Sequence, residues 1–318
     1  MNTNPTSAIA VTGLRKSYGD KVVLDGIDLN VATGTIFALL GPNGAGKTTM
    51  VNILSTLIGF DEGHVQVAGH DVISDPDAVR AAIGVTGQFS AIDNLLTGEE
   101  NLMLMADLFH LPKAEGRRRV DELLERFDLV DAGTQIPATY SGGMQRRLDL
   151  AMGLVGSPRI VFLDEPTTGL DPRGRHTVWE SIRKLASDQV TVLLTTQYLE
   201  EADRLADRIA LLDRGEIVAE GTPAELKRLV PGGHISLRFS DPAQMETAAK
   251  VLETAESDSS QLTLQIPADG GIGTLRSVLD RLDRREVEVD SLTVHTPDLD
   301  DVFFALTGRR DTESRTAS

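Results

Sequence analysis

The residues of this chain best suited to chemistry form a glycine-rich segment with one lysine and two threonines. The segment satisfies the pattern G-x-x-x-x-G-K-[ST], in which converging backbone N–H groups bind phosphate oxygens at the start of a helix. In this pattern the Lys47 ammonium reaches the β- and γ-phosphates, and the Thr48 hydroxyl is a ligand for Mg²⁺. The sequence therefore predicts a nucleoside triphosphate site formed by Gly41, Pro42, Asn43, Gly44, Ala45, Gly46, Lys47, Thr48 and Thr49.

Two carboxylates follow the apolar run 160–163. A carboxylate at the end of a buried strand is placed to hold a metal ion beside a phosphate loop, which suits Asp164. Glu165 points differently and is placed to polarise a water toward the γ-phosphate. The alternative, an ordinary strand-to-loop transition, would be the better interpretation of an isolated Asp-Glu pair, but here a phosphate loop accompanies it.

A third candidate segment, Ser141-Gly142-Gly143, precedes a run with apolar residues at helical spacing. Ser141 is a natural N-cap, and the two glycines allow a phosphate to approach the exposed N–H groups. By itself Ser-Gly-Gly predicts only a helix cap, and its position shortly before Asp164 gives it weight. Further upstream, Thr97 and Glu100 predict a capping box at the start of another apolar helix.

The elements that position these residues alternate between strands and helices up to about residue 230. Short apolar runs predict strands over 8–12, 21–31, 35–40, 160–163, 190–195 and 208–212, and a helix begins after Gly46. This alternation indicates an α/β fold with a largely parallel sheet. The stretch from about 89 to 156 contains no good strand, so we expect a helical subdomain inserted into the α/β domain, which spans 1–230.

Pro231-Gly232-Gly233 interrupts the alternation and predicts a domain boundary. Beyond it, segments 234–239, 261–266 and 287–294 alternate as strands, and 274–285 has a helical pattern. Residues 231–318 are therefore expected to form a small α+β domain. It serves either as a dimerisation or regulatory element, which we favour, or as a structural cap on the first domain.

Composition excludes several classes of protein. The 318 residues include 31 Lys and Arg against 48 Asp and Glu, a net charge of −17 that disfavours nucleic acid as a partner. Cysteine is absent, which excludes disulfide scaffolds and thiolate chemistry and fits a reducing compartment. The longest charge-free apolar stretch, 50–60, is too short to span a bilayer, and the first residues lack the features of a secretory signal.

The phosphate loop, the Ser-Gly-Gly segment and the Asp-Glu strand end, in this order and spacing, resemble the ATP-binding subunits of ABC transporters. The resemblance implies a phosphate-loop NTPase fold with an inserted helical subdomain and a small C-terminal domain. It also implies that Tyr18 stacks on adenine, although a core tyrosine on a strand is the alternative. Gln88 matches the family's glutamine that touches Mg²⁺, and the alternative for it is a solvent-facing loop residue. Residues 169–171 match a loop that crosses a dimer interface in the family.

One position departs from the family pattern. Gln197 stands where most members have a histidine that contacts the γ-phosphate. A glutamine amide donates a hydrogen bond to phosphate but carries no proton to transfer. Thr-Thr-Gln-Tyr-Leu over 195–199, the segment 141–149 and the C-terminal segment 299–308 are similar to the daunorubicin-resistance type of exporter subunit, so the resemblance extends over almost the whole chain.

The resemblance implies two ATP molecules held between two copies of the chain, each by Lys47, Thr48 and Asp164 of one copy and by Ser141 and Gly143 of the other. We therefore expect an ATPase at the cytoplasmic face of the membrane that powers efflux of a hydrophobic drug or lipid-like compound through a separate permease subunit. One alternative is a non-transport soluble ABC ATPase acting on ribosomes or DNA. Another is a module that holds ATP without turnover, which Gln197 favours and Glu165 disfavours.

Overall fold

The computed structural model describes residues 7–306 except positions 89, 231–232, 253–255, 259, 269–271 and 296. The chain divides into two compact units, Met1–Pro223 (unit 1) and Ala224–Ser318 (unit 2). Of the boundary predicted at 231–233, positions 231 and 232 lie outside the described residues, as do residues 307–308 of the C-terminal segment. Across the described ranges, no helix is long and apolar enough to span a bilayer.

The central sheet of unit 1 has the strand order β10-β9-β3-β8-β7-β6. All neighbours are parallel except β10, which runs antiparallel to β9 at one edge. Strands β3, β7 and β8 are buried along their whole length, which explains their continuous apolar sequences. The strands are β3 (Ile36–Leu40), β6 (Ile83–Thr86), β7 (Ile160–Asp164), β8 (Thr191–Thr196), β9 (Arg208–Asp213) and β10 (Glu216–Gly221).

Parallel strands place their carboxyl ends at one edge of the sheet, and the candidate chemistry follows four such ends. The phosphate loop comes after β3, Glu165 after β7 and Gln197 after β8. Gln88 follows β6, which pairs with β7. The sheet topology therefore explains how residues far apart in the sequence meet.

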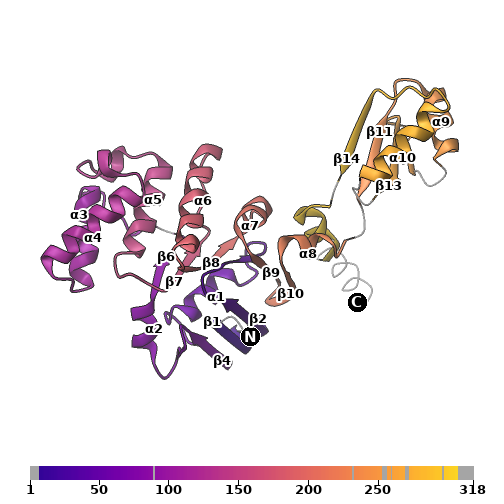
Figure 1. Cartoon of the computed structure of the whole chain (residues 1–318). Helices are drawn as coiled ribbons and strands as arrows, with labels where there is room; N and C mark the ends of the chain where they lie inside the picture. The colour runs from indigo at the N-terminus through magenta and orange to yellow at the C-terminus, as the bar shows by residue number, and fades with distance from the viewer. Residues whose placement is uncertain are drawn as a thin grey trace, which may run out of the picture. The chain divides into compact units, whose positions relative to one another are not determined.

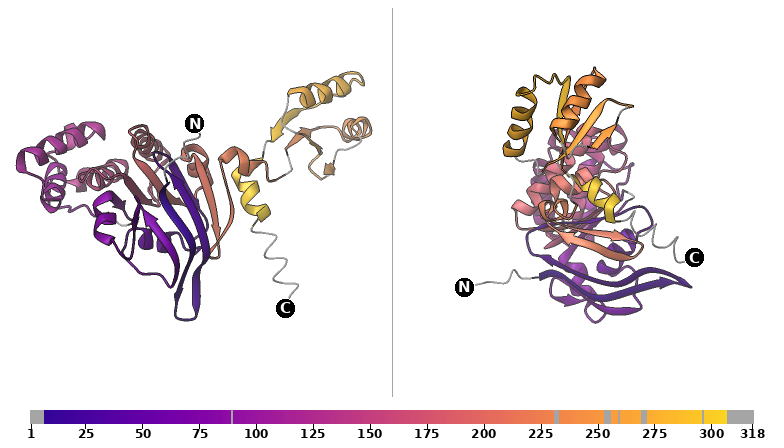
Figure 2. Two further views of the ribbon diagram at one scale, coloured as in Figure 1. Left: turned by 60° about the horizontal axis from the view of Figure 1, so that its bottom comes forward. Right: turned by 90° about the vertical axis from the view of Figure 1, so that its right-hand side faces the viewer.

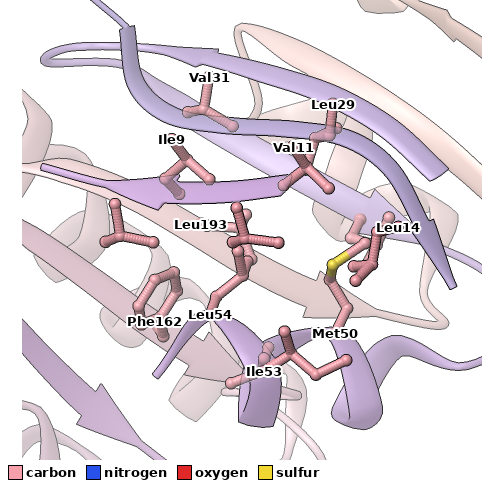
Figure 3. Packing of buried hydrophobic residues seen from close by; sticks show 14 of the residues in the cluster. Ile9, Val11, Leu14, Leu29, Val31, Met50, Ile53, Leu54, Phe162 and Leu193 are labelled. Carbon is pink, nitrogen blue, oxygen red and sulfur yellow. The ribbon is translucent and has the colours of Figure 1, made fainter. Parts of the chain in front are cut away.

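A second, antiparallel sheet of order β2-β1-β4-β5 was not predicted from the sequence. Its strands are β1 (Ser7–Tyr18), β2 (Lys21–Ala32), β4 (Glu62–Val67) and β5 (His70–Asp71). In the right-hand view of Figure 2, the long indigo strands β1 and β2 form a layer along one side of unit 1. Figure 3 shows Ile9 and Leu29 of this sheet facing Leu54 of α1 (Lys47–Leu54) and Phe162 of the central sheet, and all four are buried.

The stretch between β6 and β7 is helical, as expected. It contains α3 (Gly98–Leu108), α4 (Lys113–Arg126), α5 (Gly142–Gly153) and two short 3₁₀ helices, Val130–Ala132 and Pro137–Thr139, and the three α-helices group together in magenta in Figure 1. The predicted capping box of α3 is confirmed, because Thr97 Oγ1 accepts from Glu100 N at 3.2 Å and Thr97 N donates to Glu100 Oε2 at 2.7 Å. The other helices of unit 1 are α2 (Pro76–Ala82), α6 (Pro172–Ser187) and α7 (Leu199–Leu205).

Unit 2 contains an antiparallel sheet of order β12-β13-β11-β14 whose one face packs on two helices. The elements β11 (His234–Arg238), α9 (Pro242–Val251), β12 (Glu256–Asp258), β13 (Thr263–Pro267), α10 (Ile272–Asp283) and β14 (Ser291–His295) follow the β-α-β-β-α-β order of ferredoxin-like folds. The short helix α8 (Pro223–Lys227) precedes them. The α+β class agrees with expectation, whereas α9 and β12 were not predicted and the last strand begins at Ser291 rather than at 287.

Candidate nucleotide-binding site

The phosphate loop connects β3 to α1, and two of its glycines are required by their surroundings. A side-chain carbon at Gly41 would lie 2.2 Å from the Leu212 carbonyl oxygen. Gly46 has a φ of 113°, and a side-chain carbon there would lie 2.7 Å from Leu24 Cδ2. The backbone therefore packs closely against β2 and β9, and the loop leads into the first N–H groups of α1, which have no acceptor within the helix.

Lys47 and Glu165 face each other across the loop. The Lys47 side chain is only 5% exposed, and its Nζ lies 3.4 Å from Glu165 Oε1. Nζ also donates to the carbonyl oxygens of Gly41 at 2.8 Å and Pro42 at 3.1 Å. Glu165 has a φ of 47°, which is uncommon for a residue with a side chain, and its N–H is held by the carbonyl and hydroxyl oxygens of Thr195, both at 3.1 Å. A cation and a carboxylate are thus fixed beside the phosphate loop.

Oxygen ligands for a divalent cation lie beside this pair. Thr48 Oγ1 donates to Asp164 Oδ2 at 2.9 Å, and the Thr195 hydroxyl donates to Asp164 Oδ1. Asp164 is 3% exposed, so its carboxylate is held by these hydroxyls rather than by bulk water. A hydroxyl and a carboxylate adjacent to a phosphate site form an oxygen donor set that fits Mg²⁺.

Most of the predicted phosphate-binding residues border one hollow of about 390 Å³. Gln88 borders it from the segment after β6, but its side chain is exposed, so its role at the metal stays a prediction beside the alternative of a solvent-facing loop residue. The hollow is lined by Lys21, Val23, Asn43, Gly44, Gly46, Lys47, Thr48, Thr49, Gln88 and Glu165. Lys21 and Val23 were not predicted, because they come from the separate antiparallel sheet.

Several predicted residues lie outside this lining: Tyr18, Gly41, Pro42, Ala45, Asp164, Gln197 and the Ser-Gly-Gly segment. Tyr18 ends β1 and is 52% exposed, with Lys16 Nζ 5.2 Å from its ring centroid. This exposure excludes the interpretation of Tyr18 as a core residue. Gln197 is half-buried directly after β8 and does not border the hollow.

Ser141 lies at a different hollow, of about 650 Å³. It is the N-cap of α5, as predicted, and accepts a hydrogen bond from Met144 N at 3.3 Å. Gly142, Gly143 and the loop residues 169–171 border the same hollow. One chain therefore does not bring Ser141 to its own phosphate loop, although it does gather Ser141 with the loop that was predicted to cross a dimer interface.

The sequence motifs give no role to Arg146 and Asp149, yet Arg146 contacts the backbone beside the site and Asp149 pairs with Arg146. Arg146 Nη1 donates to Asp149 Oδ2 at 2.8 Å and to the Gly87 carbonyl at 3.0 Å. Its Nε donates to the Pro166 carbonyl at 2.8 Å, and its Nη2 donates to the Asp164 carbonyl at 3.2 Å. Burial lowers the pKa of Arg146 and raises the pKa of Asp149. The signal that could have identified them is their i, i+3 spacing on a predicted helix.

Glu201 is a second unpredicted residue, a carboxyl with no exposed surface on α7. Its Oε1 accepts from the Thr167 hydroxyl at 2.8 Å and from Trp179 Nε1 at 2.9 Å. Burial raises the pKa of Glu201, and this effect exceeds the lowering by donors from Thr196, Thr167 and Trp179. The Glu201 carboxyl therefore links α7, the helix that follows Gln197, to Thr167 in the loop that follows Glu165. Trp179 is buried, as its position in a helical pattern predicts.

The Glu201→Gln variant is expected to lose part of the pH dependence of stability. Because the folded pKa lies above the ordinary value of 4.5, the stabilisation from this group is complete below pH 4.5 and is lost as the pH rises toward the folded pKa. Glutamine keeps an oxygen acceptor and cannot ionise. The melting temperature of the variant relative to the parent should therefore rise with pH above 4.5, measured by thermal unfolding from about pH 4 to 8.

Glu200→Gln is the matched control, since Glu200 is the exposed neighbour that pairs with Arg204 at 3.1 Å. This control should not reproduce the pH-dependent difference. A difference between Glu201→Gln and the parent that stays constant over the whole pH range would contradict the assignment of a raised pKa to Glu201.

Comparison with known proteins gives a family match for each of the two units of the chain. Residues 24–168 match the ABC transporter family, and residues 221–307 match the C-terminal domain of ATP-binding proteins like DrrA1-3. The daunorubicin resistance ATP-binding protein DrrA3 of Streptomyces coeruleorubidus is 49% identical over 304 residues, which cover 95% of this chain and 96% of that protein. The Nod factor export ATP-binding protein I of Sinorhizobium fredii is 37% identical over 315 residues, 95% of this chain and 86% of that protein.

Solved structures agree with this relationship. An ATP-binding subunit of an ABC transporter has a TM-score of 0.62 at 29% identity, over 70% of this chain and 92% of the other. A dimeric ATP-binding cassette in a post-hydrolysis state, bound to ADP and Pi, has a TM-score of 0.60 at 29% identity, over 67% of this chain and 98% of the other. The chain shares nearly half of its residues with DrrA3 along almost its whole length, and it folds its phosphate loop in the same kind of cassette as the solved ATP-binding subunit. It therefore belongs to the ABC transporter family, among the ATP-hydrolysing subunits of the daunorubicin-resistance type.

Proposed function

We propose that this chain powers the export of a hydrophobic drug or lipid-like compound through a separate membrane subunit. The observation that carries the proposal is the similarity of both units to one relative that is 49% identical over 95% of the chain. That relative is named for daunorubicin resistance, and a second one is named for Nod factor export. The first name concerns resistance and the second concerns export, and neither concerns ribosomes or DNA.

The working form of the protein is a pair of chains that share two ATP molecules. Ser141 and Gly143 border a hollow separate from the one around Lys47, so a second copy is needed to bring them to the same nucleotide. A similar cassette has been solved as a dimer bound to ADP and Pi. ATP bridges the two copies, and its hydrolysis removes the contacts of the γ-phosphate and releases them. Within the part of unit 2 that the structure describes, the edge strands β12 and β14 each pair on one side only, which suits support of this dimer.

Within each site the residues have separate tasks. The loop N–H groups and Lys47 bind the phosphates, while Glu165, held by Thr195, polarises the attacking water. The Gln197 amide donates to the γ-phosphate, and Tyr18 packs on the adenine. Mg²⁺, held by Thr48, Asp164 and Gln88, supplies positive charge to the β- and γ-phosphates when bound.

The chain attaches to the cytoplasmic face of the membrane by docking on its permease. Leu104 and Leu108 lie one helical turn apart on α3 and are 43% and 63% exposed, although Leu102 on the other side of the helix is buried. Leu95, just before α3, is 89% exposed. Apolar side chains exposed on one helix face are typical of a surface that receives a partner. Gln88, which borders the hollow around the phosphate loop, lies seven positions before Leu95 in the chain.

The Leu104→Glu/Leu108→Glu double variant is expected to lose the permease while keeping its own ATPase activity. A carboxylate buried in an apolar contact without a partner costs several kcal/mol, so co-isolation from membranes should fall by about 10²-fold or more. Val130→Glu, on the 3₁₀ helix of the same stretch and 61% exposed in the parent, is the control and should bind normally. Equal recovery of the permease with the double variant and with the control would contradict this docking surface.

The proposal is tested by isolating a tagged Glu165→Gln chain from native membranes in the presence of ATP. We expect a multispanning membrane protein to come with it, which then supplies the partner for substrate assays. Recovery of the chain alone, or with ribosomes, would instead favour the alternative of a non-transport soluble ABC ATPase, and the efflux function would be withdrawn.

A further inference from the structure

Arg146 holds the backbone on both sides of Glu165. Its guanidinium donates to the carbonyl oxygens of Asp164 at 3.2 Å and Pro166 at 2.8 Å, the residues directly before and after Glu165. A third bond, at 3.0 Å, reaches the carbonyl of Gly87, the residue before Gln88. The Arg146 side chain thus binds the backbone on both sides of Glu165 and also the segment that leads to Gln88, a predicted metal-site residue.

The backbone of Glu165 is strained, so the hydrogen bonds that Arg146 makes on either side of it matter for its conformation. A φ of 47° is sparsely populated for a residue with a side chain and costs about 1–3 kcal/mol, so it persists only where the surroundings fix it. Thr195 binds the Glu165 N–H, and Arg146 binds the carbonyls on either side. Loss of the Arg146 bonds frees the peptide units that hold the Glu165 carboxylate 3.4 Å from Lys47 Nζ.

The helix that carries Arg146 begins at the other hollow. Ser141, its N-cap, lies five positions before Arg146, which is about 7.5 Å along an α-helix. Ser141 borders the hollow that a partner's ATP would occupy, whereas Glu165 and Gln88 border the chain's own phosphate loop. Helix α5 therefore connects two different nucleotide sites within one chain.

We propose that Arg146 is a positioning residue that couples the two ATP sites: a movement of Ser141 on the partner's nucleotide is transmitted along α5 to the peptide groups around Glu165. The inference rests on the shared-site dimer of the proposed function. Asp149 keeps the guanidinium in place, because it accepts from Arg146 at 2.8 Å and from Ala91 N at 3.2 Å, beyond Gln88. Both side chains are largely buried, 11% and 4% exposed, so neither is free to exchange its partner for water.

Arg146→Lys separates coupling from simple ion pairing. Lysine keeps the positive charge for Asp149, but a single ammonium cannot reach three carbonyl groups from one planar fork. We expect ATP binding within about twofold of the parent, kcat lowered by about 10²-fold because Glu165 is misplaced, and loss of cooperativity of ATP hydrolysis with respect to ATP concentration. The measurements are the full ATP dependence of hydrolysis, nucleotide binding, and the melting temperature of the whole chain.

Arg119→Lys is the control, because Arg119 is a half-buried arginine on α4 that donates to the Leu154 carbonyl at 2.8 Å. It should leave kcat and cooperativity unchanged. Cooperative hydrolysis by Arg146→Lys like that of the parent, whether or not kcat falls, would overturn the inference and leave the proposed function standing. A fall in kcat that matches only the loss of folded protein would also overturn it. Absence of cooperativity in the parent itself would overturn both the shared-site dimer and the inference.

Discussion

The Glu165→Gln variant is expected to hydrolyse ATP about 10²- to 10⁴-fold more slowly than the parent chain while still binding the nucleotide. Glutamine has nearly the same shape as glutamate, so the backbone bonds from Thr195 and Arg146 that hold position 165 remain possible. What is lost is the negative carboxylate that polarises a water. The change therefore acts on the chemical step and leaves the phosphate loop intact.

The measurement is steady-state phosphate release together with nucleotide binding for both chains. Because uncleaved ATP keeps bridging the two copies, the variant should also accumulate as an ATP-dependent dimer in size-exclusion chromatography. The matched control is Glu180→Gln, an exposed glutamate on α6 beyond the loop after Glu165, which should hydrolyse ATP at the parent rate. A parent chain already as slow as Glu165→Gln would contradict the hydrolytic role and favour a module that holds ATP without turnover.

The Lys47→Ala variant is expected to lose nucleotide affinity rather than turnover alone. Lys47 is 5% exposed and is the buried cation next to Glu165 and the phosphate loop. Lys47→Ala removes the cation that would pair with the bound phosphates, and truncating one partner of such a charge pair across a binding interface costs about 2–5 kcal/mol, which is roughly 30- to 5,000-fold in affinity. The loop carbonyls of Gly41 and Pro42 would also lose their donor, so loop order should decrease.

Titration with a fluorescent ATP analogue measures this loss, and the melting temperature in the absence of nucleotide shows whether the fold persists. Lys113→Ala is the control, because Lys113 begins α4 at an exposed position and should leave affinity unchanged. Affinity within a few-fold of the parent in Lys47→Ala would be inconsistent with Lys47 as a phosphate ligand. Together with Glu165→Gln, this variant separates binding of the triphosphate from its cleavage.

The chemistry of the phosphate loop could be predicted from sequence because the requirements are local. The run from Gly41 to Thr48 contains the glycines, the lysine and the hydroxyl within one strand-loop-helix turn, and the structure places it there. The same holds for Ser141, whose capping of α5 depends on a residue three positions away. Strands β3, β7 and β8 could also be predicted from sequence, because a strand buried on both faces is a continuous apolar run.

The sequence by itself thus determined the α/β class, the phosphate loop and the candidate carboxylates, all of which depend on neighbours along the chain. Tertiary structure decided which distant groups meet. Thr48 bonds Asp164 across 116 positions, Arg146 binds peptide groups on either side of Glu165, and Ser141 lies at a hollow apart from the phosphate loop. The physical reason is that strand pairing and helix packing bring together residues that are far apart in the sequence, and no periodic pattern in the sequence marks these pairs. Only the folded chain fixes the geometry of buried groups such as Glu201.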